Sequence, residues 1–251
     1  MIRKKEDPIE WLQFELLGNF PELIHGVFLR RGGLSQEAFS SLNFSRSVGD
    51  EGAHVSANIE IVKSVLKIPT IVSSKNIHGT QIDFVNSTSL GEIAGSDGLM
   101  TDEKGVGLMV KHADCQAIIL FDPVRLAIAN IHVGWRGNVQ EIIQKAVESM
   151  VGRFNSRAEN LLACISPSLG PTAAEFKNYK EEFPEKFWPF RIGENSFNLW
   201  ELSKQQLLNA GLLPHHIEIA ALCTYSNPQD YFSYRRDKIC GRNGTVVCLS
   251  V

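Results

Sequence analysis

Short apolar runs with strand-like composition recur along most of the chain and alternate irregularly with segments of helical period. Strands are expected at Ile24 to Arg30, Ile68 to Ser73, Gln81 to Val85, Val106 to His112, Ala117 to Phe121, Leu126 to Val133, Leu161 to Ile165, Ile217 to Leu222 and Thr245 to Leu249. Helices are expected at Ala53 to Leu66, Val139 to Val151, Tyr179 to Phe183 and Leu199 to Ala210. This irregular order favours a mixed α+β fold over strict βαβ winding.

The pattern contains no Pro/Ser/Gly-rich linker, low-complexity tract or internal repeat. Residues 1–251 are therefore expected to form a single domain. The apolar stretches are shorter than the ~20 residues of a membrane span, and no signal-type apolar core follows the N-terminus. We expect a cytoplasmic protein without a membrane partner.

Composition narrows the possible partners. With 43% hydrophobic and 21% charged residues the chain is typical of globular proteins, and its formal net charge is −3. Nucleic acid is not expected as a partner, because binding to phosphate backbones needs a surplus of clustered Lys and Arg. The five cysteines are odd in number and widely spaced, which favours reduced thiols over a disulfide framework.

The segment from residue 106 to 151 allows a register argument. Asp122-Pro123-Val124-Arg125 is typical of a type I turn, with Asp accepting a backbone hydrogen bond and Pro presetting φ. A hairpin centred between Pro123 and Val124 places Cys115 directly opposite His132. Side chains so opposed share one face of the sheet, so this thiolate and imidazole could bind one metal ion or share a proton.

A glycine-rich turn, Val133-Gly134-Trp135-Arg136-Gly137-Asn138, follows His132 and precedes an amphipathic helix. Asn138 and Glu141 resemble a capping box, so the helix is expected to begin there. The free backbone N–H groups of that helix start, with Arg136 beside them, would suit a phosphate or carboxylate.

A third candidate ligand is His78, in Asn76-Ile77-His78-Gly79-Thr80-Gln81. With Cys115 and His132 it makes a set that suits a catalytic zinc with an open fourth position. Taken singly, the three are more often a loop histidine, a buried thiol and a hydrogen-bonded strand-end histidine. His112 and Asp114 flank the cysteine, and either could be a fourth ligand or orient a ligand.

Aromatic and basic residues gather near the C-terminus, in Tyr231-Phe232-Ser233-Tyr234-Arg235-Arg236-Asp237 and Gly241-Arg242. Such rings and guanidinium groups could stack a purine and bind an anion. The alternative is a strand edge with a solvated charge run and inward-packed tyrosines. An earlier glycine turn carries Arg30, which could also reach the site.

Several motifs together resemble the YfiH or laccase-domain family. They are Ser96-Asp97-Gly98-Leu99-Met100-Thr101-Asp102, Ala113-Asp114-Cys115, His132-Val133-Gly134-Trp135-Arg136-Gly137, Ile165-Ser166-Pro167-Ser168-Leu169-Gly170-Pro171 and Phe232-Ser233-Tyr234-Arg235-Arg236-Asp237. The likeness runs from Arg30 to Leu249. It implies one domain of two packed mixed β-sheets flanked by helices, with a zinc site at His78, Cys115 and His132.

Members of this family are described as purine nucleoside phosphorylases with adenosine deaminase activity, as peptidoglycan-editing factors and as polyphenol oxidases. The resemblance favours a zinc-dependent phosphorylase that takes adenosine, inosine or methylthioadenosine together with phosphate, and that deaminates adenosine. Its catalytic residues would be His78, Cys115 and His132. The candidate substrate- and phosphate-binding residues are Arg30, Arg136, Tyr234, Arg235, Arg236 and Arg242.

Three alternatives remain open. In a Cys–His hydrolase or amidase of peptidoglycan precursor editing, His132 would activate Cys115 as the nucleophile. A copper-dependent polyphenol oxidase is the least favoured, because seven histidines cannot supply the ligands of a multicopper site, though copper remains a possible ion. A non-catalytic metabolite sensor could use the same pocket. The chain departs from the family pattern at Ile59, where Arg is usual, and at His112, where Thr is usual.

Overall fold

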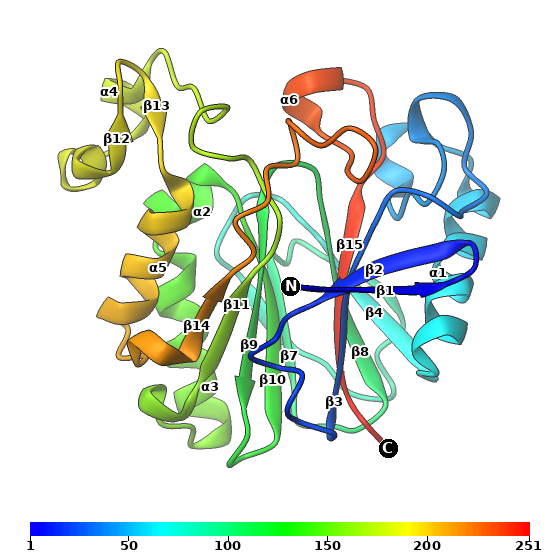
Figure 1. Cartoon of the computed structure of the whole chain (residues 1–251). Helices are drawn as coiled ribbons and strands as arrows, with labels where there is room; N and C mark the ends of the chain where they lie inside the picture. The colour runs from blue at the N-terminus through cyan, green and yellow to red at the C-terminus, as the bar shows by residue number, and fades with distance from the viewer.

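Two β-sheets packed face to face form the centre of the molecule, and helices cover their outer faces (Figure 1). A computed structural model describes all 251 residues. The seven-stranded sheet has the order β1 (Ile2–Glu6), β2 (Ile9–Gln13), β3 (Leu23–Phe28), β15 (Asn243–Leu249), β8 (Val106–His112), β4 (Thr70–Lys75) and β6 (Gly91–Ala94). The six-stranded sheet has the order β14 (Ile217–Ile219), β11 (Leu162–Ile165), β9 (Gln116–Asp122), β10 (Ala127–Val133), β7 (Gly98–Thr101) and β5 (Ile82–Phe84).

Both sheets are mixed. Strand β4 is parallel to β6 and β8, β11 is parallel to β14, and β5 is parallel to β7, whereas the other pairs are antiparallel. Helix α1 (Gly52–Leu66) covers the seven-stranded sheet, and α3 (Ile142–Phe154) and α5 (Leu199–Asn209) cover the six-stranded one (Figure 1). Short helices α2 (Trp135–Val139), α4 (Tyr179–Glu182) and α6 (Tyr234–Asp237) and a small sheet of β12 (Arg191–Ile192) and β13 (Ser196–Phe197) complete the chain. The predicted α+β fold of two packed mixed sheets flanked by helices is confirmed.

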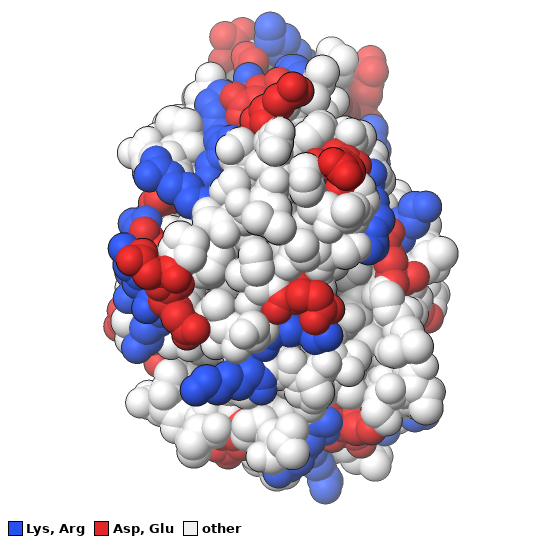
Figure 2. All heavy atoms as spheres, turned by 90° about the vertical axis from the view of Figure 1, so that its right-hand side faces the viewer, with Lys and Arg blue, Asp and Glu red and all other residues white.

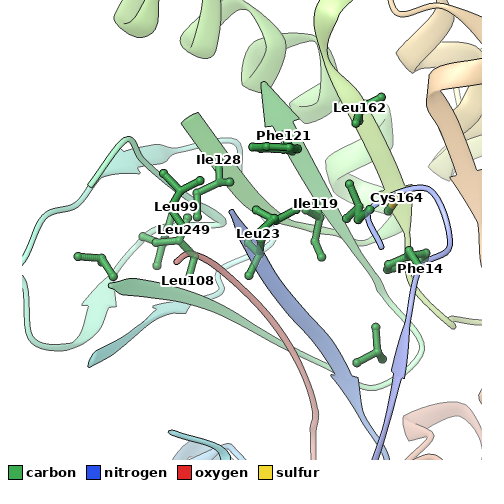
Figure 3. Close-up of a cluster of buried hydrophobic side chains, with 14 of the residues drawn as sticks. Phe14, Leu23, Leu99, Leu108, Ile119, Phe121, Ile128, Leu162, Cys164 and Leu249 are labelled. Carbon is green, nitrogen blue, oxygen red and sulfur yellow. The ribbon is translucent and has the colours of Figure 1, made fainter. Parts of the chain in front are cut away.

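The largest buried cluster lies between the two sheets (Figure 3). Strand β9 shows why its sequence is apolar without interruption. Ile119 and Phe121 enter this central cluster, while Ile118 and Leu120 enter a second cluster under α3 and α5. Because neighbouring residues of a strand point to opposite faces, a strand buried on both faces needs an apolar residue at each position.

Three connections carry the chain from the seven-stranded sheet to the six-stranded one. They join β4 to β5, β6 to β7 and β8 to β9. The candidate ligand His78 lies in the first connection and Cys115 in the third, while Asp97 lies in the second. His132 lies near the end of β10. The fold thus places chemically active residues where the chain changes sheets.

All nine predicted strands and four predicted helices are present; β8 has the predicted bounds, and the other elements have shifted ends. Strands β1, β2, β6, β7, β12 and β13 were not predicted. Strand β1 carries mostly charged residues that are all exposed, so it has no alternating pattern and forms by pairing with β2. Strand β7 is fully buried but has only four residues. No helix of the structure is long and apolar enough to cross a lipid bilayer.

The predicted register of the β9–β10 hairpin is wrong. Strand β9 ends at Asp122 and β10 begins at Ala127, so the loop has four residues instead of two. The Asp122 carboxylate does accept hydrogen bonds from the backbone N–H groups of Val124 and Arg125, at 2.9 and 3.1 Å. The longer loop moves the pairing by two positions, and His132 pairs with Ala117 instead of Cys115.

The predicted capping box is wrong as well. Asn138 lies inside α2, and its buried amide donates hydrogen bonds to Ser203 Oγ and Gln206 Oε1 on α5. Glu141 has a φ of 60° and separates α2 from α3, and its side chain makes no capping bond. Contacts with a distant helix therefore replace the local cap, and the helix begins earlier than predicted, at Trp135.

Charges of both signs are mixed on the face that carries α1. Lys and Arg side chains lie beside Asp and Glu around an uncharged centre, without an extended basic surface on this face (Figure 2).

Candidate metal centre

His78, Cys115 and His132 come together at one point of the structure. One possible ligand atom from each, either ring nitrogen of a histidine or the Sγ of Cys115, lies within 4.8 Å of the others. The two imidazole rings have their centroids 4.9 Å apart and stand nearly perpendicular, at 85°. His132 is buried, Cys115 is half-buried and His78 is exposed. The three side chains thus form a cluster with one open side.

The backbone around the cluster explains how three distant residues meet. His78 has a φ of 60° and Asp114, just before Cys115, has a φ of 83°. Such left-handed conformations are uncommon outside glycine, although His and Asp adopt them more readily than most residues. They reverse the chain sharply within the two connections, which turns each side chain toward the end of β10.

Gly134 leaves the room that the cluster needs. A Cβ atom at this position would lie 3.0 Å from Cys115 Sγ and 3.1 Å from His78 Cδ2. Contacts this close force a neighbouring atom to move. Gly134 therefore acts by its lack of a side chain, since its φ of −83° is open to any residue.

Asp97 is the residue that links the cluster together. Its Oδ1 accepts hydrogen bonds from His78 N and His132 Nδ1, each at 3.0 Å, and its Oδ2 accepts from Ile77 N at 3.1 Å and Gly79 N at 2.7 Å. The carboxylate is fully buried. With Nδ1 as the donor to Asp97, His132 directs Nε2, the nitrogen that can carry a proton or bind a metal ion, away from Asp97. The sequence motif Ser96-Asp97-Gly98 was noted without a role for this residue.

The electrostatics of the cluster favour an ionised thiol. Burial raises the pKa of Cys115, but the adjacent His132 and His78 together outweigh burial and lower it to about 6. Burial lowers the pKa of His132, but Cys115 and Asp97 outweigh it and raise it to about 9. Burial likewise raises the pKa of Asp97, yet the hydrogen bonds from His132 and Gly79 hold it below its ordinary value. A thiolate is the form of cysteine that binds metals and attacks electrophiles.

The residues beside the cysteine have other contacts. His112 Nε2 lies 2.9 Å from Thr245 Oγ1, and burial lowers the pKa of His112 to about 3, so its ring is neutral. The Asp114 carboxylate accepts hydrogen bonds from Thr224 Oγ1 at 2.7 Å and from Arg235 N at 2.6 Å. Neither residue belongs to the three-residue cluster.

The donor set fits a zinc ion. Two imidazoles and one thiolate are typical of a catalytic zinc that keeps a fourth position for a reactant. Ligand atoms of a tetrahedral zinc lie about 3.3–3.8 Å apart, so atoms already within 4.8 Å need only small movements. A blue-copper site would add a weak axial ligand such as Met. The nearby Met109 is instead fully buried in a cluster that includes residues of α1 and β3.

Two cavities open beside the cluster. The first, of about 590 Å³, is lined by the apolar residues Trp135, Phe176 and Leu199 together with polar and charged residues. The second, of about 560 Å³, has polar and charged walls and contacts His132. Five residues line both: His78, Ala113, Cys115, Arg136 and Tyr234. A ligand held by the cluster would be reachable from either side.

Four of the six candidate substrate residues line these cavities. Arg136 and Tyr234 line both, Arg235 lines the first and Arg242 lines the second. The Arg136 guanidinium lies over the Trp135 ring, 4.3 Å from its centroid.

The other two candidates, Arg30 and Arg236, line neither cavity. Arg30 donates hydrogen bonds to the carbonyl oxygens of Ser40 and Pro228. Arg236 donates to those of Thr224, Tyr225 and Tyr231 and to the Asp237 carboxylate. Both guanidinium groups hold loops together in this structure.

The fold that carries this cluster is similar to that of known proteins. Residues 24–250 match the model of the family described as multi-copper polyphenol oxidoreductase laccase, and the chain belongs to this family. The crystal structure of YlmD from Geobacillus stearothermophilus superposes with a TM-score of 0.91 at 28% identity, covering 100% of this chain and 99% of that one. The Bacillus licheniformis hypothetical protein YfiH gives 0.87 at 25% identity, covering 98% of both chains.

Two curated relatives are both named purine nucleoside phosphorylase. A purine nucleoside phosphorylase of Bacteroides thetaiotaomicron is 29% identical over 244 residues, covering 90% of each chain. Purine nucleoside phosphorylase YlmD of Bacillus subtilis is 27% identical over 248 residues, covering 91% of this chain and 88% of that one. The resemblance to the YfiH or laccase-domain family is thereby confirmed.

Proposed function

We propose that this protein is a zinc-dependent purine nucleoside phosphorylase that also deaminates adenosine. The observation that carries the proposal is the His78, Cys115 and His132 cluster, which opens on two cavities and has the donor set of a catalytic zinc. The names of the curated relatives support the same reaction. Adenosine, inosine and methylthioadenosine are the proposed nucleosides, with phosphate as the second substrate.

Phosphorolysis sets clear demands on the site. An oxygen of hydrogen phosphate forms a bond with C1′ of the ribose, and the bond from C1′ to the purine nitrogen breaks. The electron pair leaves with the base, and the proton of hydrogen phosphate ends on the base, so the products are a ribose 1-phosphate and a free purine. The site must bind a dianion beside a nucleoside and stabilise the charge that develops on the base.

The chain's own residues meet these demands from two sides. His78, Cys115 and His132 would hold the zinc, and Asp97 fixes the orientation of His132. A zinc ion bound there would supply a Lewis acid with one open position. Trp135 and Phe176 offer aromatic walls in the first cavity, where a purine ring could stack.

In deamination, water replaces the amino group at C6 of adenosine and ammonia leaves. The reacting carbon belongs to the base, so it too would lie on the side of the aromatic cavity. The same cluster would then serve both reactions, with the bound nucleoside placed differently.

Copper oxidase chemistry is not favoured by the ligand count. The structure holds one group of three or more possible metal ligands, that of His78, Cys115 and His132. A multicopper centre needs several such groups, chiefly imidazoles. The family description therefore does not extend to a multicopper reaction in our proposal.

The proposal is tested with the purified protein. Zinc content is measured by mass spectrometry, and inosine cleavage is followed with and without phosphate. We expect one zinc per chain, phosphate-dependent release of hypoxanthine, and loss of turnover in His132→Ala. Stoichiometric zinc without turnover of any of the three nucleosides would overturn the proposed function.

A second candidate function is a Cys–His hydrolase, favoured by the pKa of about 6 at Cys115 beside His132. The thiolate would attack a carbonyl carbon, His132 would give its proton to the leaving amine, and water would release the acyl group. The two candidates differ in their metal requirement. A metal-free protein that loses activity on alkylation of Cys115 supports the hydrolase, whereas activity that follows zinc content supports the phosphorylase.

A further inference from the structure

The second cavity differs from the first in the charge of its walls. Besides the shared Arg136, its lining contains the cations Lys75, Lys111 and Arg242 and a single carboxylate, Glu92. The first cavity has three carboxylates beside its cations, namely those of Asp114, Glu175 and Glu182. The second cavity therefore has a clear excess of positive charge, and it lies directly against the proposed ligands His78, Cys115 and His132.

Most of these cations have no acidic partner in the chain. Lys75 and the Arg136 guanidinium make no hydrogen bond or ion pair with the protein, and Arg242 donates only to the carbonyl oxygens of Cys240 and Gly241 and the Cys240 thiol. Lys111 is paired with Glu92. Unpaired cations that face one cavity repel one another, so an anion placed among them would be stabilised.

Lys111 lies among these positive charges. Its side chain is buried and its ammonium is bound to Glu92. Burial lowers the pKa of Lys111, Glu92 opposes burial, and the positive charges of Arg46 and Lys75 lower the pKa further. One carboxylate thus compensates several cations.

The cavity also offers hydroxyl donors of the kind that bind phosphate oxygens. Ser45 and Ser47 line it, with their Oγ atoms 2.9 Å apart. Lysine and arginine supply charge, and serine hydroxyls supply hydrogen bonds to the remaining oxygens of an oxyanion. The cavity lacks the Trp135 and Phe176 rings of the first, and its one Phe, Tyr or Trp side chain is Tyr234, which lines both.

We propose that the second cavity is the binding site for the inorganic phosphate of the reaction, with Lys75, Lys111, Arg136 and Arg242 as its cations. This inference rests on the proposed function and adds the direction from which phosphate approaches the ribose. Phosphate reaches C1′ from the side of His132, while the nucleoside occupies the aromatic cavity. Arg136, which lines both cavities, lies between the two substrates. Lys75 and Lys111 are phosphate-binding residues that the sequence patterns did not indicate.

The test uses the zinc-loaded full chain and measures phosphate binding apart from turnover. Calorimetry gives the Kd for inorganic phosphate, and steady-state kinetics give separate KM values for phosphate and inosine. The variants are Lys75→Gln and the double variant Lys75→Gln with Arg242→Gln. Lys75 is exposed and unpaired, so its removal leaves no buried carboxylate alone. Lys177→Gln is the matched control, since Lys177 is an exposed lysine that lines only the first cavity.

We expect the Kd and KM for phosphate to rise about threefold in Lys75→Gln and at least tenfold in the double variant, because Lys75 is exposed and its charge is screened by water, whereas the double variant removes two cations from one cavity. The KM for inosine should change less than twofold. The Kd for phosphate should be unchanged in Lys177→Gln.

An unchanged phosphate Kd in the double variant, or a larger effect from Lys177→Gln, would overturn the assignment. So would a rise in the KM for inosine alone. Inosine 5′-monophosphate provides a further arm: if the same substitutions weaken its binding but not that of inorganic phosphate, the cavity binds the 5′-phosphate of a nucleotide and our assignment is wrong. The protein could also bind phosphate and lose that binding in the variants, yet show no phosphorylase activity. That result would support the anion site and overturn only the proposed reaction.

Discussion

Replacing Asp97 by Asn tests whether one buried carboxylate holds the candidate metal centre together. Each oxygen of Asp97 accepts two hydrogen bonds, and all four donors are N–H groups. An asparagine has one oxygen and one NH2 group. Whichever way the amide is turned, two of the four N–H donors would face another donor instead of an acceptor.

The magnitude follows from the number of lost contacts. Two hydrogen bonds to a charged acceptor are worth about 1.5–3 kcal/mol each, so about 3–6 kcal/mol is at stake. A neutral amide costs less to bury than a carboxylate, which returns part of this amount. We expect Asp97→Asn to lower the free energy of unfolding of the metal-free protein by about 2–4 kcal/mol.

Zinc binding should weaken by more than a general loss of stability explains. His132 loses the acceptor that fixes its tautomer, and the connection that carries His78 loses part of its anchor. Removing the hydrogen-bond partner of a ligating histidine typically costs 10–100-fold in metal affinity. We expect a loss of that size in Asp97→Asn.

Two measurements check this prediction. Urea unfolding gives the change in stability, and competition with a chromophoric chelator gives the zinc Kd under conditions where the variant is folded. The absorption spectrum of the cobalt-substituted protein reports the geometry of the ligands. Asp102→Asn is the matched control, because Asp102 is exposed and makes no hydrogen bond through its side chain. An unchanged zinc Kd and cobalt spectrum in Asp97→Asn would refute the reasoning.

Three further predictions concern single residues. Cys115→Ser should weaken zinc binding at least 100-fold, because a neutral hydroxyl is a poor substitute for a thiolate; full zinc occupancy against a chelator would show that Cys115 is not a ligand. Gly134→Ala should destabilise the protein by about 1–3 kcal/mol in urea unfolding and lower zinc affinity, since its Cβ would lie 3.0 Å from Cys115 Sγ; wild-type values would mean that the cluster adapts freely. Burial lowers the pKa of His25 to about 4 in the folded chain, against about 6.5 when unfolded, so the unfolded state binds more protons between these values. Stability should fall by up to about 3 kcal/mol as the pH drops from 6.5 to 4, and His25→Gln should remove that part of the slope in urea unfolding.

A backbone hydrogen bond to His25 couples its titration to the folded structure. Its Nε2 accepts a hydrogen bond from Phe14 N at 2.8 Å. Protonation of Nε2 would turn this acceptor into a donor that faces another donor. The ring is therefore neutral in the folded protein.

The sequence by itself determined the main elements of the fold and pointed to the candidate ligands. The uninterrupted apolar run of β9 and the helical period of α3 and α5 could be predicted because burial on one or both faces leaves a periodic record in the chain. The candidate set of His78, Cys115 and His132 came from ligand chemistry and from the family resemblance. The expectation that Cys115 and His132 lie close together rested partly on a predicted hairpin register that is wrong.

Only the tertiary structure decided how these residues meet. The connections at residues 76–81 and 113–115 bring His78 and Cys115 to the end of β10. Nothing in the local sequence of either connection indicates that it lies beside the other. The roles of Asp97 and Asn138 depend on partners far away in sequence, so local rules gave Asp97 no role and made Asn138 a helix cap. The basic residues near the C-terminus looked alike, yet Arg236 binds carbonyl groups of a loop while Arg242 lines a cavity. Periodicity records which face of an element is buried, but it does not record which distant groups that face will contact.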